Sequence, residues 1–250
     1  MIRINQVKLR IPHTEEELKN KVAKMLRVPV SRILTFRIVK QSMDARKKPE
    51  LYYVYTIDLA LADESIILKK NRGNQITKSP EQSYKFSVSG SQKLSHRPIV
   101  IGSGPAGLFC AYMLAHAGYK PLLLERGADV DTRTKDVAGF WENGVLNPES
   151  NVQFGEGGAG TFSDGKLNTL VKDPLGRNTK VLELFIEHGA PEEIRYINKP
   201  HIGTDILTTV VKKMRQAIEA AGGEVRFHSK VTDFIIKNHS LTGLIVNETE

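Results

Sequence analysis

The chain has 250 residues and a mass of 27.9 kDa, which at about 150 residues per domain corresponds to between one and two domains. A hydrophobic fraction of 40%, 20 glycines and a charged fraction of 26% are usual for globular proteins and exclude a largely disordered or fibrous chain. The net charge of +8 is unevenly distributed. Residues 1–97 carry 20 basic and 9 acidic side chains, whereas residues 98–250 carry 16 and 19, so only the N-terminal part is basic.

Targeting and redox signals are weak. Residues 1–10, MIRINQVKLR, interleave charges with apolar residues, which excludes a signal-peptide core and makes the cytoplasm the expected location. Residues 98–119 lack formal charges, but their glycines and proline argue against a lipid-exposed span, so we expect no membrane association. A single cysteine, Cys110, excludes a disulfide framework, a CxxC pair and a cysteine-based zinc site.

The first 90 residues predict a small α+β domain. Alternating apolar residues at 7–11 predict a strand, and Thr14-Glu15-Glu16-Glu17 forms a capping box that starts a helix ending before Pro29. The further elements expected are a strand at 34–38, a basic hairpin tip at 46–49, a strand at 51–61, a short helix at 64–72 and a last strand at 84–88. This order is typical of a ferredoxin-like split βαβ domain. We assign it residues 1–92, including a polar linker at its end.

The remaining residues, 93–250, predict an α/β domain. An apolar strand at 98–101, a glycine turn, a helix at 104–117 and a strand at 121–124 form one βαβ unit of a Rossmann-like fold. The elements that follow are a helix at 179–189, a helix capped by Thr204 or Asp205 that stops at Gly222, a strand at 225–228, and two strands at 234–236 and 244–246 that resemble part of a β-meander.

The glycine turn carries a dinucleotide fingerprint, which consists of Gly102, Ser103, Gly104, Pro105, Ala106 and Gly107. Gly102 permits the tight turn, Gly104 lets backbone amides approach a pyrophosphate, and Gly107 lets the helix pack on the strand. Glu125, at the end of the next strand, is expected to accept hydrogen bonds from a ribose. A 2′-phosphate would meet this carboxylate as a like charge, which favours FAD or NAD over NADP, although the adjacent Arg126 weakens the exclusion. The alternative is a glycine turn in an unrelated α/β sheet.

A second glycine loop lies at residues 155–160. Its amides, including those of Gly157, Gly158 and Ala159, could form a nest around a phosphate or a flavin edge, with Thr161 and Lys166 as polar arms. Residues 160–166 also match GxxxxGK, but the next residue is leucine rather than the serine or threonine of a P-loop. A surface loop without a ligand is the other alternative.

Four segments together carry a resemblance to a known family. Residues 98–127, PIVIGSGPAGLFCAYMLAHAGYKPLLLERG, resemble the FAD-binding unit of flavoproteins of the glutathione-reductase superfamily. The segments FGEGGAGTFSDGKL at 154–167, KPHIGTD at 199–205 and MDARKKPELYYVYTIDL at 43–59 resemble poorly characterised bacterial FAD-dependent dehydrogenases, related in fold to the succinate dehydrogenase flavoprotein. The resemblance implies FAD as the cofactor and favours cofactor contact for the second glycine loop. Members of such families continue well past residue 250, so we expect this chain to be an N-terminal part with an incomplete FAD site.

The same resemblance raises two further candidates. His201 lies within KPHIGTD and is a candidate acid or base toward a substrate, with a surface turn histidine as the alternative. Val231 follows the strand that in this superfamily commonly meets the adenine through main-chain groups, which makes it a candidate cofactor contact. Cys110, on the dinucleotide helix, is expected to be a buried packing residue rather than a nucleophile.

Nucleic-acid binding is the alternative for the basic domain. Tyr52, Tyr53 and Tyr55 could stack on bases, as in RNA-binding modules. However, Tyr53 and Tyr55 share the apolar face of their strand, so core packing explains them, and we do not expect a nucleic-acid partner.

The leading hypothesis is therefore a FAD-dependent oxidoreductase in which FAD accepts a hydride or an electron pair from a small-molecule substrate. NAD(P)H or another electron carrier would be its redox partner, and no metal is expected. The alternative is a nucleotide- or RNA-binding module without redox turnover. The sequence assigns neither the substrate nor an oligomeric state.

Overall fold

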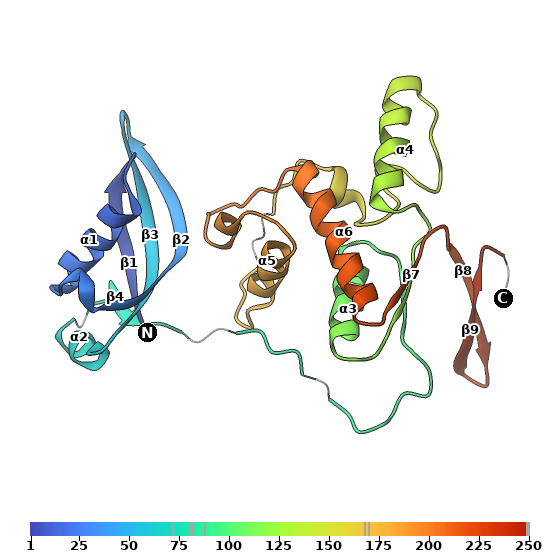
Figure 1. The fold of residues 1–250 in the computed structure, drawn as a ribbon, viewed down its shortest axis with the longest axis horizontal. Coiled ribbons are helices and arrows are strands. Elements are labelled where there is room, and N and C mark those ends of the chain that lie inside the picture. Colours follow the sequence, from blue (N-terminus) through green and yellow to red (C-terminus); the bar gives the residue numbers. More distant parts are fainter. Residues whose placement is uncertain (72, 81–82, 88, 168, 170, 249–250) are drawn as a thin grey trace. The chain divides into compact units, whose positions relative to one another are not determined.

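The computed structural model describes residues 1–71, 73–80, 83–87, 89–167, 169 and 171–248. The chain groups into two compact units (Figure 1). Unit 1 comprises Met1–Tyr84, Asn168–Glu183 and Glu192–Pro200, and unit 2 comprises Lys85–Leu167, Leu184–Pro191 and His201–Glu250. The first division falls between Tyr84 and Lys85, and unit 1 also includes segments from the second half of the chain.

Unit 1 is built on a four-stranded antiparallel sheet with the strand order β2-β3-β1-β4. Its elements are β1 (Ile2–Arg10), α1 (Glu15–Leu26), a 3-10 turn (Val30–Arg32), β2 (Ile33–Lys47), β3 (Glu50–Leu61), α2 (Glu64–Lys70) and β4 (Ile76–Lys78). This is the ferredoxin-like split βαβ order expected from the sequence. The predicted last strand at 84–88 is wrong for residues 84–87, which form no strand, while Val88 lies outside the described residues.

The core of unit 1 follows from the amphipathic pattern of α1 and β3. The Thr14 hydroxyl accepts a hydrogen bond from the Glu17 amide at 3.2 Å, and the Glu17 carboxylate accepts one from the Thr14 amide at 2.7 Å, so the capping box forms as predicted. Leu18 and Val22 of α1 are buried against the sheet. Leu34, however, is 68% exposed, because a register shift between Ile33 and Thr35 turns it away from the core.

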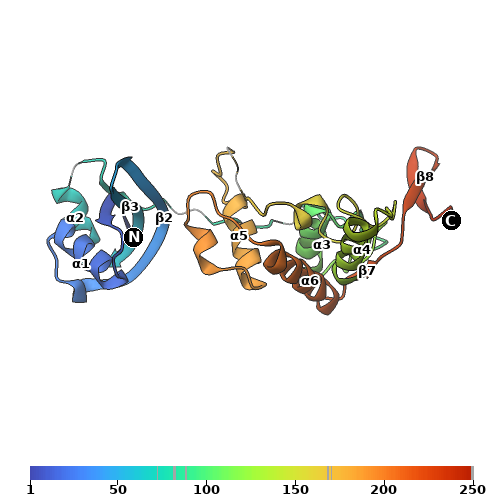
Figure 2. The ribbon, with the colours of Figure 1, turned by 90° about the horizontal axis from the view of Figure 1, so that it is seen from above.

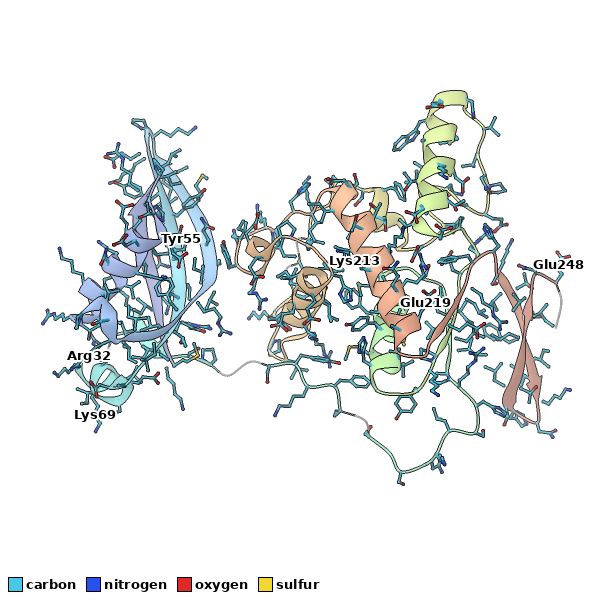
Figure 3. The ribbon with its side chains drawn as sticks, in the orientation of Figure 1. Arg32, Tyr55, Lys69, Lys213, Glu219 and Glu248 are labelled. Carbon is cyan, nitrogen blue, oxygen red and sulfur yellow. The ribbon has the colours of Figure 1, made fainter. Side chains whose placement is uncertain are left out.

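The tyrosines of β3 divide between the two faces of the sheet. Tyr55, labelled in Figure 3, is buried in the core cluster, and Tyr53 packs against that cluster. Burial raises the pKa of Tyr55 to about 12. Tyr52, on the opposite face, donates a hydrogen bond to Glu50, and the Lys8 ammonium lies 4.1 Å from its ring centroid. Two of the three tyrosines therefore serve packing, as the apolar pattern indicates.

One residue on the outer edge of β2, Gln41, is paired with a distant segment of the same unit. The Gln41 amide donates to the Tyr196 carbonyl at 2.7 Å, and the Asn198 amide donates to the Gln41 carbonyl at 2.8 Å. Gln41 and Ile197 thus form a parallel bridge. Unit 1 is completed by residues 196–198, which a reading of the first 90 residues alone could not include.

Unit 2 contains a three-stranded parallel sheet in the order β5-β6-β7 and a separate antiparallel hairpin. Its elements are β5 (Ile99–Ile101), α3 (Pro105–His116), β6 (Leu122–Leu124), α4 (Val130–Asn143), a 3-10 turn (Ala159–Phe162), α6 (Thr204–Ala220), β7 (Glu224–Arg226), β8 (Val231–Lys237) and β9 (Ser240–Val246). Helix α5 (Arg177–Glu187) begins in unit 1 and ends in unit 2, and the 3-10 turn Glu192–Arg195 belongs to unit 1. The α/β Rossmann-like fold is confirmed, and of the expected β-meander the described residues form one hairpin.

Helices α3 and α6 pack side by side against the parallel sheet (Figure 2). Buried residues of α3 recur at Leu108, Ala111, Tyr112 and Ala115, which is the spacing of one helix face. Cys110 lies off this stripe and is exposed, so the expectation that it is buried is wrong.

The start of α6 also differs from the prediction. Its N-cap is Gly203, which has no side chain with which to cap, and Thr204 is the first helical residue. Neither Thr204 nor Asp205 is therefore the cap.

Candidate functional site

The glycine turn joins β5 to α3, and its geometry explains two of its glycines directly. Gly102 has φ of +86°, and its amide donates to the Leu124 carbonyl of β6 at 2.7 Å. A Cβ atom on Gly107 would lie 1.8 Å from the Gly102 carbonyl oxygen, so the helix packs this closely only with glycine there. A Cβ atom on Gly104 would meet nothing within 4 Å among the described residues. Gly104 therefore borders open space.

The N-terminus of α3 faces the same open space. Gly104 is the N-cap, so no side chain can occupy the first amides, and Pro105 at the first helical position has no amide hydrogen. The amides of Ala106 and Gly107 remain as donors, and the helix dipole adds partial positive charge. This end of the helix suits an anionic group.

Glu125 follows β6 and is 4% exposed. One carboxylate oxygen, Oε2, accepts from the Ser103 amide at 2.7 Å and from the Ser103 hydroxyl at 2.8 Å, while Oε1 accepts from the Gly127 amide at 2.8 Å. A carboxylate has about four acceptor sites. These hydrogen bonds use three of them, so one site remains, on Oε1. The carboxylate thus fixes the glycine turn and retains capacity for one hydroxyl donor.

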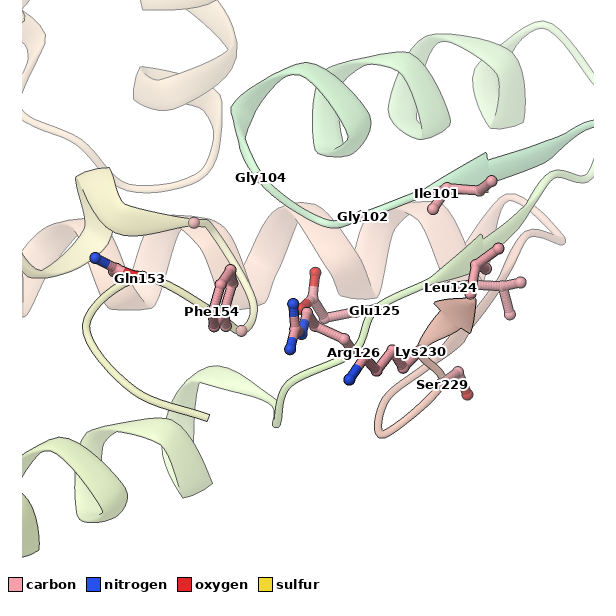
Figure 4. A pocket seen from close by; sticks show the side chains of 13 residues that line it. Ile101, Gly102, Gly104, Leu124, Glu125, Arg126, Gln153, Phe154, Ser229 and Lys230 are labelled. Carbon is pink, nitrogen blue, oxygen red and sulfur yellow. The ribbon is translucent and has the colours of Figure 1, made fainter. Parts of the chain in front are cut away.

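The turn and Glu125 share a cavity of about 270 Å³ (Figure 4). It is lined by Ile101, Gly102, Gly104, Leu124, Glu125, Arg126, Gln153, Phe154, Gly155, Gly158, Ser229, Lys230 and Val231. The predicted residues Gly102, Gly104, Glu125, Arg126, Gly158 and Val231 are therefore brought together. Gln153, Ser229 and Lys230 are additional lining residues that no sequence motif indicated, whereas Phe154 and Gly155 begin the segment 154–167.

The second glycine loop is held by Arg133 of α4, a residue that sequence reasoning missed. Its buried guanidinium donates to five carbonyl oxygens, those of Asn151, Val152, Gly155, Glu156 and Gly158, at 2.7–3.3 Å. Burial lowers the pKa of Arg133 to about 10, although nearby Glu125 and Glu156 oppose the shift. A Cβ atom on Gly155 would lie 2.5 Å from Arg133 Cδ, so glycine is required where the loop wraps this side chain.

Glu156 and Gly157 attach the second loop to its surroundings. The Gly157 amide donates to the Ser103 carbonyl at 2.9 Å, which joins the two glycine loops directly. The buried Glu156 carboxylate accepts from the Val130 amide at 2.7 Å and from Arg215 Nε of α6 at 2.8 Å. Burial raises the pKa of Glu156 despite these contacts.

Residues after Gly158 enter a 3-10 turn. Gly157 and Gly158 have φ of +85° and +68°, and Ala159 begins the turn. Thr161 is 1% exposed, and its hydroxyl has no hydrogen-bond partner among the described residues. A Cβ atom on Gly157 would lie 2.2 Å from this hydroxyl oxygen, so Thr161 packs on Gly157 rather than lining the cavity.

Lys166 and His201 lie near each other but not among the residues that line the cavity. They form an isolated antiparallel bridge, in which the Ile202 amide donates to the Gly165 carbonyl at 2.9 Å. Lys166 forms an exposed ion pair with Asp164 at 2.7 Å. The hydrogen bond from Lys166 lowers the pKa of Asp164, with a smaller contribution from His201. The predicted arm Lys166 is thus committed to Asp164.

The described part of the chain lacks two features, a metal-binding cluster and a membrane-spanning helix. No cluster of three or more histidine, cysteine, aspartate or glutamate side chains there could hold a metal ion. No helix within that part has the length and apolar character needed to cross a membrane.

Sequence comparison gives two family matches and one relative. Residues 1–60 match a domain of unknown function, DUF8436, and residues 100–147 match the NAD(P)-binding Rossmann-like domain. An uncharacterized protein of Clostridium beijerinckii is 43% identical over 246 residues, which cover 98% of this chain and 46% of that protein. The chain thus spans about half the length of this curated relative.

Two solved structures have distant similarity. Glycine oxidase from Bacillus cereus has 15% identity and a TM-score of 0.32, with 62% of this chain and 52% of that chain covered. L-amino acid deaminase from Proteus vulgaris has 9% identity and a TM-score of 0.30, with 67% and 47% covered. At these scores neither match bears on function. The Rossmann-like family match shows a nucleotide-binding type of domain and coincides with the glycine turn.

Proposed function

We propose that this chain is the nucleotide-holding part of a FAD-dependent oxidoreductase. The observation that carries the proposal is the buried Glu125, which lies at the end of β6, fixes the glycine turn through Ser103, and shares one cavity with Gly102 and Gly104. This arrangement has the donors, the open space and the carboxylate that an adenosine diphosphate group requires.

The residues fit the ADP half of FAD. The amides of Ala106 and Gly107 would bind the pyrophosphate across the open space beside Gly104. The remaining acceptor site of Glu125 would take one ribose hydroxyl, and Val231, at the start of β8, would contact the adenine from the cavity wall. When bound, FAD supplies the hydride- or electron-accepting ring that no protein side chain provides.

The choice of FAD rather than a nicotinamide cofactor rests on the sequence resemblance and on the second glycine loop. The loop is joined to the first through Gly157 and Ser103, and the amides of Gly157, Gly158 and Thr161 already donate to backbone carbonyls. The amides of Ala159 and Gly160 would extend the anion-binding surface beyond the pyrophosphate. His201, which bridges to Lys166 outside the residues that line the cavity, would act as the acid or base toward a small-molecule substrate. The family of bacterial FAD-dependent dehydrogenases, NAD(P)H or another electron partner, and a cytoplasmic location belong to the same proposal.

The test is cofactor binding by the purified chain. We expect a visible flavin absorption band after purification or after incubation with FAD, and thermal stabilisation by both FAD and ADP. At a ligand concentration of 100 times Kd, the stabilisation corresponds to about 2.7 kcal/mol. The variant Gly104→Ala should lose this stabilisation, because its methyl group projects into the space assigned to phosphate without touching the protein.

A colourless protein that neither FAD nor ADP stabilises would overturn the proposal. ADP binding without FAD binding would support the nucleotide site but refute the assignment of FAD as the cofactor. Steeply salt-dependent binding to polynucleotide in place of FAD would favour the alternative nucleic-acid module.

A further inference from the structure

Two cations line the adenosine cavity and share one carboxylate. Arg126 directly follows Glu125, and its Nε and Nη2 atoms lie 2.8 and 2.7 Å from Glu149 Oε2. Lys230 donates to the other oxygen, Glu149 Oε1, at 3.0 Å. These hydrogen bonds, that of Lys230 first, hold the pKa of Glu149 below its ordinary value, so the carboxylate is ionised at neutral pH. Arg126 and Lys230 line the cavity, whereas Glu149, which binds both of them, is not one of the lining residues.

The backbone places Glu149 at this position. Its amide donates to Asn147 Oδ1 at 3.0 Å, which forms a turn, and the Asn151 side chain closes the same turn on the Asn147 carbonyl at 2.8 Å. The Glu149 carbonyl oxygen would lie 2.8 Å from a Cβ atom on Gly127, so this turn packs directly on the backbone that follows Glu125. The turn thus fixes the backbone of Glu149, while its side chain is 40% exposed.

Arg126 is further fixed by an aromatic ring. Its guanidinium carbon lies 3.9 Å from the centroid of Phe154, which also lines the cavity. The carboxylate takes the Nε–H and one Nη2–H, so the ion pair and the ring fix the orientation of the guanidinium and neutralise its charge, while three of its five N–H donors remain.

These contacts affect whether the cavity can bind a ribose that carries a 2′-phosphate. Recognition of a 2′-phosphate in a Rossmann-like site uses an arginine near the end of the second strand, the position Arg126 occupies. Glu125, Glu149, Arg126 and Lys230 together sum to zero formal charge, which suits an uncharged ribose. Without Glu149 the same cavity wall would carry a net positive charge, with Arg126 and Lys230 no longer paired to this carboxylate.

We propose that Glu149 is a specificity-determining residue of this site: by pairing with Arg126 and Lys230 it fixes their orientation and neutralises the positive charge that a 2′-phosphate requires, so that the cavity selects an unphosphorylated adenosine ribose. This inference rests on the proposed nucleotide function and resolves the ambiguity that Arg126 introduces beside Glu125. No direct contact between Glu149 and the nucleotide is required.

The test compares two probes that differ only in the 2′-phosphate, ADP-ribose and 2′-phospho-ADP-ribose. Their Kd values are measured by calorimetry on the wild-type chain, on Glu149→Gln and on Glu142→Gln, an exposed glutamate of α4 whose replacement changes the net charge equally. We expect Glu149→Gln to tighten binding of 2′-phospho-ADP-ribose by about tenfold, the worth of one charge-assisted hydrogen bond, and to leave ADP-ribose within about twofold. Glu142→Gln should change neither value.

The gain should disappear when Arg126→Gln is added to Glu149→Gln, and it should shrink at high salt. If ADP-ribose binds but Glu149→Gln leaves the ratio of the two Kd values unchanged, or weakens both probes equally, the specificity role is refuted while the nucleotide site stands. If the wild-type chain binds neither probe, the nucleotide site itself is refuted, and the specificity role with it.

Discussion

Replacing Arg133 with methionine removes the guanidinium around which the second glycine loop is built. Five carbonyl oxygens of residues 151–158 would lose their donor. The carbonyl oxygens left behind would be buried without a donor, and removing one partner of a buried charged network costs about 3–5 kcal/mol. Burial lowers the pKa of Arg133 to about 10, so methionine also recovers part of the cost of burying the charge. The expected net destabilisation is therefore about 4 kcal/mol.

The assay combines urea unfolding followed by circular dichroism with hydrogen exchange of the loop amides. Arg133→Met should lower the free energy of unfolding by about 3–5 kcal/mol, which is the range for removing one partner of a buried charged network. The amides of Glu156, Gly157 and Gly158, each hydrogen-bonded in the wild type, should exchange faster. Lys135→Met, an exposed residue of the same helix, removes an equal charge and serves as the control.

Arg133→Lys separates charge from geometry. An ammonium has three donors and cannot reach five carbonyls in a fixed plane, so the lysine variant should fall between the wild type and methionine. If Arg133→Met unfolds within about 0.5 kcal/mol of the wild type, as an ordinary surface substitution does, and the loop amides stay protected, the role assigned to Arg133 is refuted.

Three further outcomes are expected. Gly107→Ala should destabilise unit 2 by at least about 2 kcal/mol, because its methyl group would overlap the Gly102 carbonyl, and an unchanged melting temperature would contradict the observed packing. Gly104→Ala should leave the melting temperature unchanged yet abolish stabilisation by ADP, and retained stabilisation would argue against the assigned phosphate position. Burial raises the pKa of Asp58, but hydrogen bonds from Arg3, Ser79 and Arg37 outweigh it and lower the pKa below the unfolded value of about 3.9. The stability that Asp58 contributes is thus full above about pH 5 and is lost as the pH falls through the folded pKa, so Asp58→Asn should flatten the acid limb of unfolding curves; an unchanged limb would exclude this contribution.

The glycine turn and Glu125 could be predicted because each constraint is local. A positive φ at Gly102, a close backbone approach at Gly107 and a carboxylate at the end of the next strand all leave marks within one continuous segment. The ferredoxin-like order of unit 1 was predictable for the same reason, since β3 alternates over its length and Thr14 begins α1 with a capping box. Strand β4, with only three residues, was too short for alternation to identify it.

Helix α4 and Arg133 could not be found in this way. The buried positions of α4 are Val130, Arg133 and Val137, so its inward face includes an arginine that a hydropathy pattern treats as solvent-facing. Its partners are backbone carbonyls, which carry no residue-type signal. Glu149 is hidden similarly, because its contacts with Arg126 and Lys230 depend on three separate segments that meet only after folding.

The pairing of Gln41 with residues 196–198 has consequences for folding during synthesis and for isolated fragments of the chain. During synthesis the Gln41 amide and carbonyl on the outer edge of β2 lack these partners until the chain has been extended to Asn198. A fragment cut at the polar linker after residue 92 would lack them permanently, and we expect its more open edge to recruit a strand from a second copy and self-associate. Adding residues 192–200 in trans as a peptide should suppress this association.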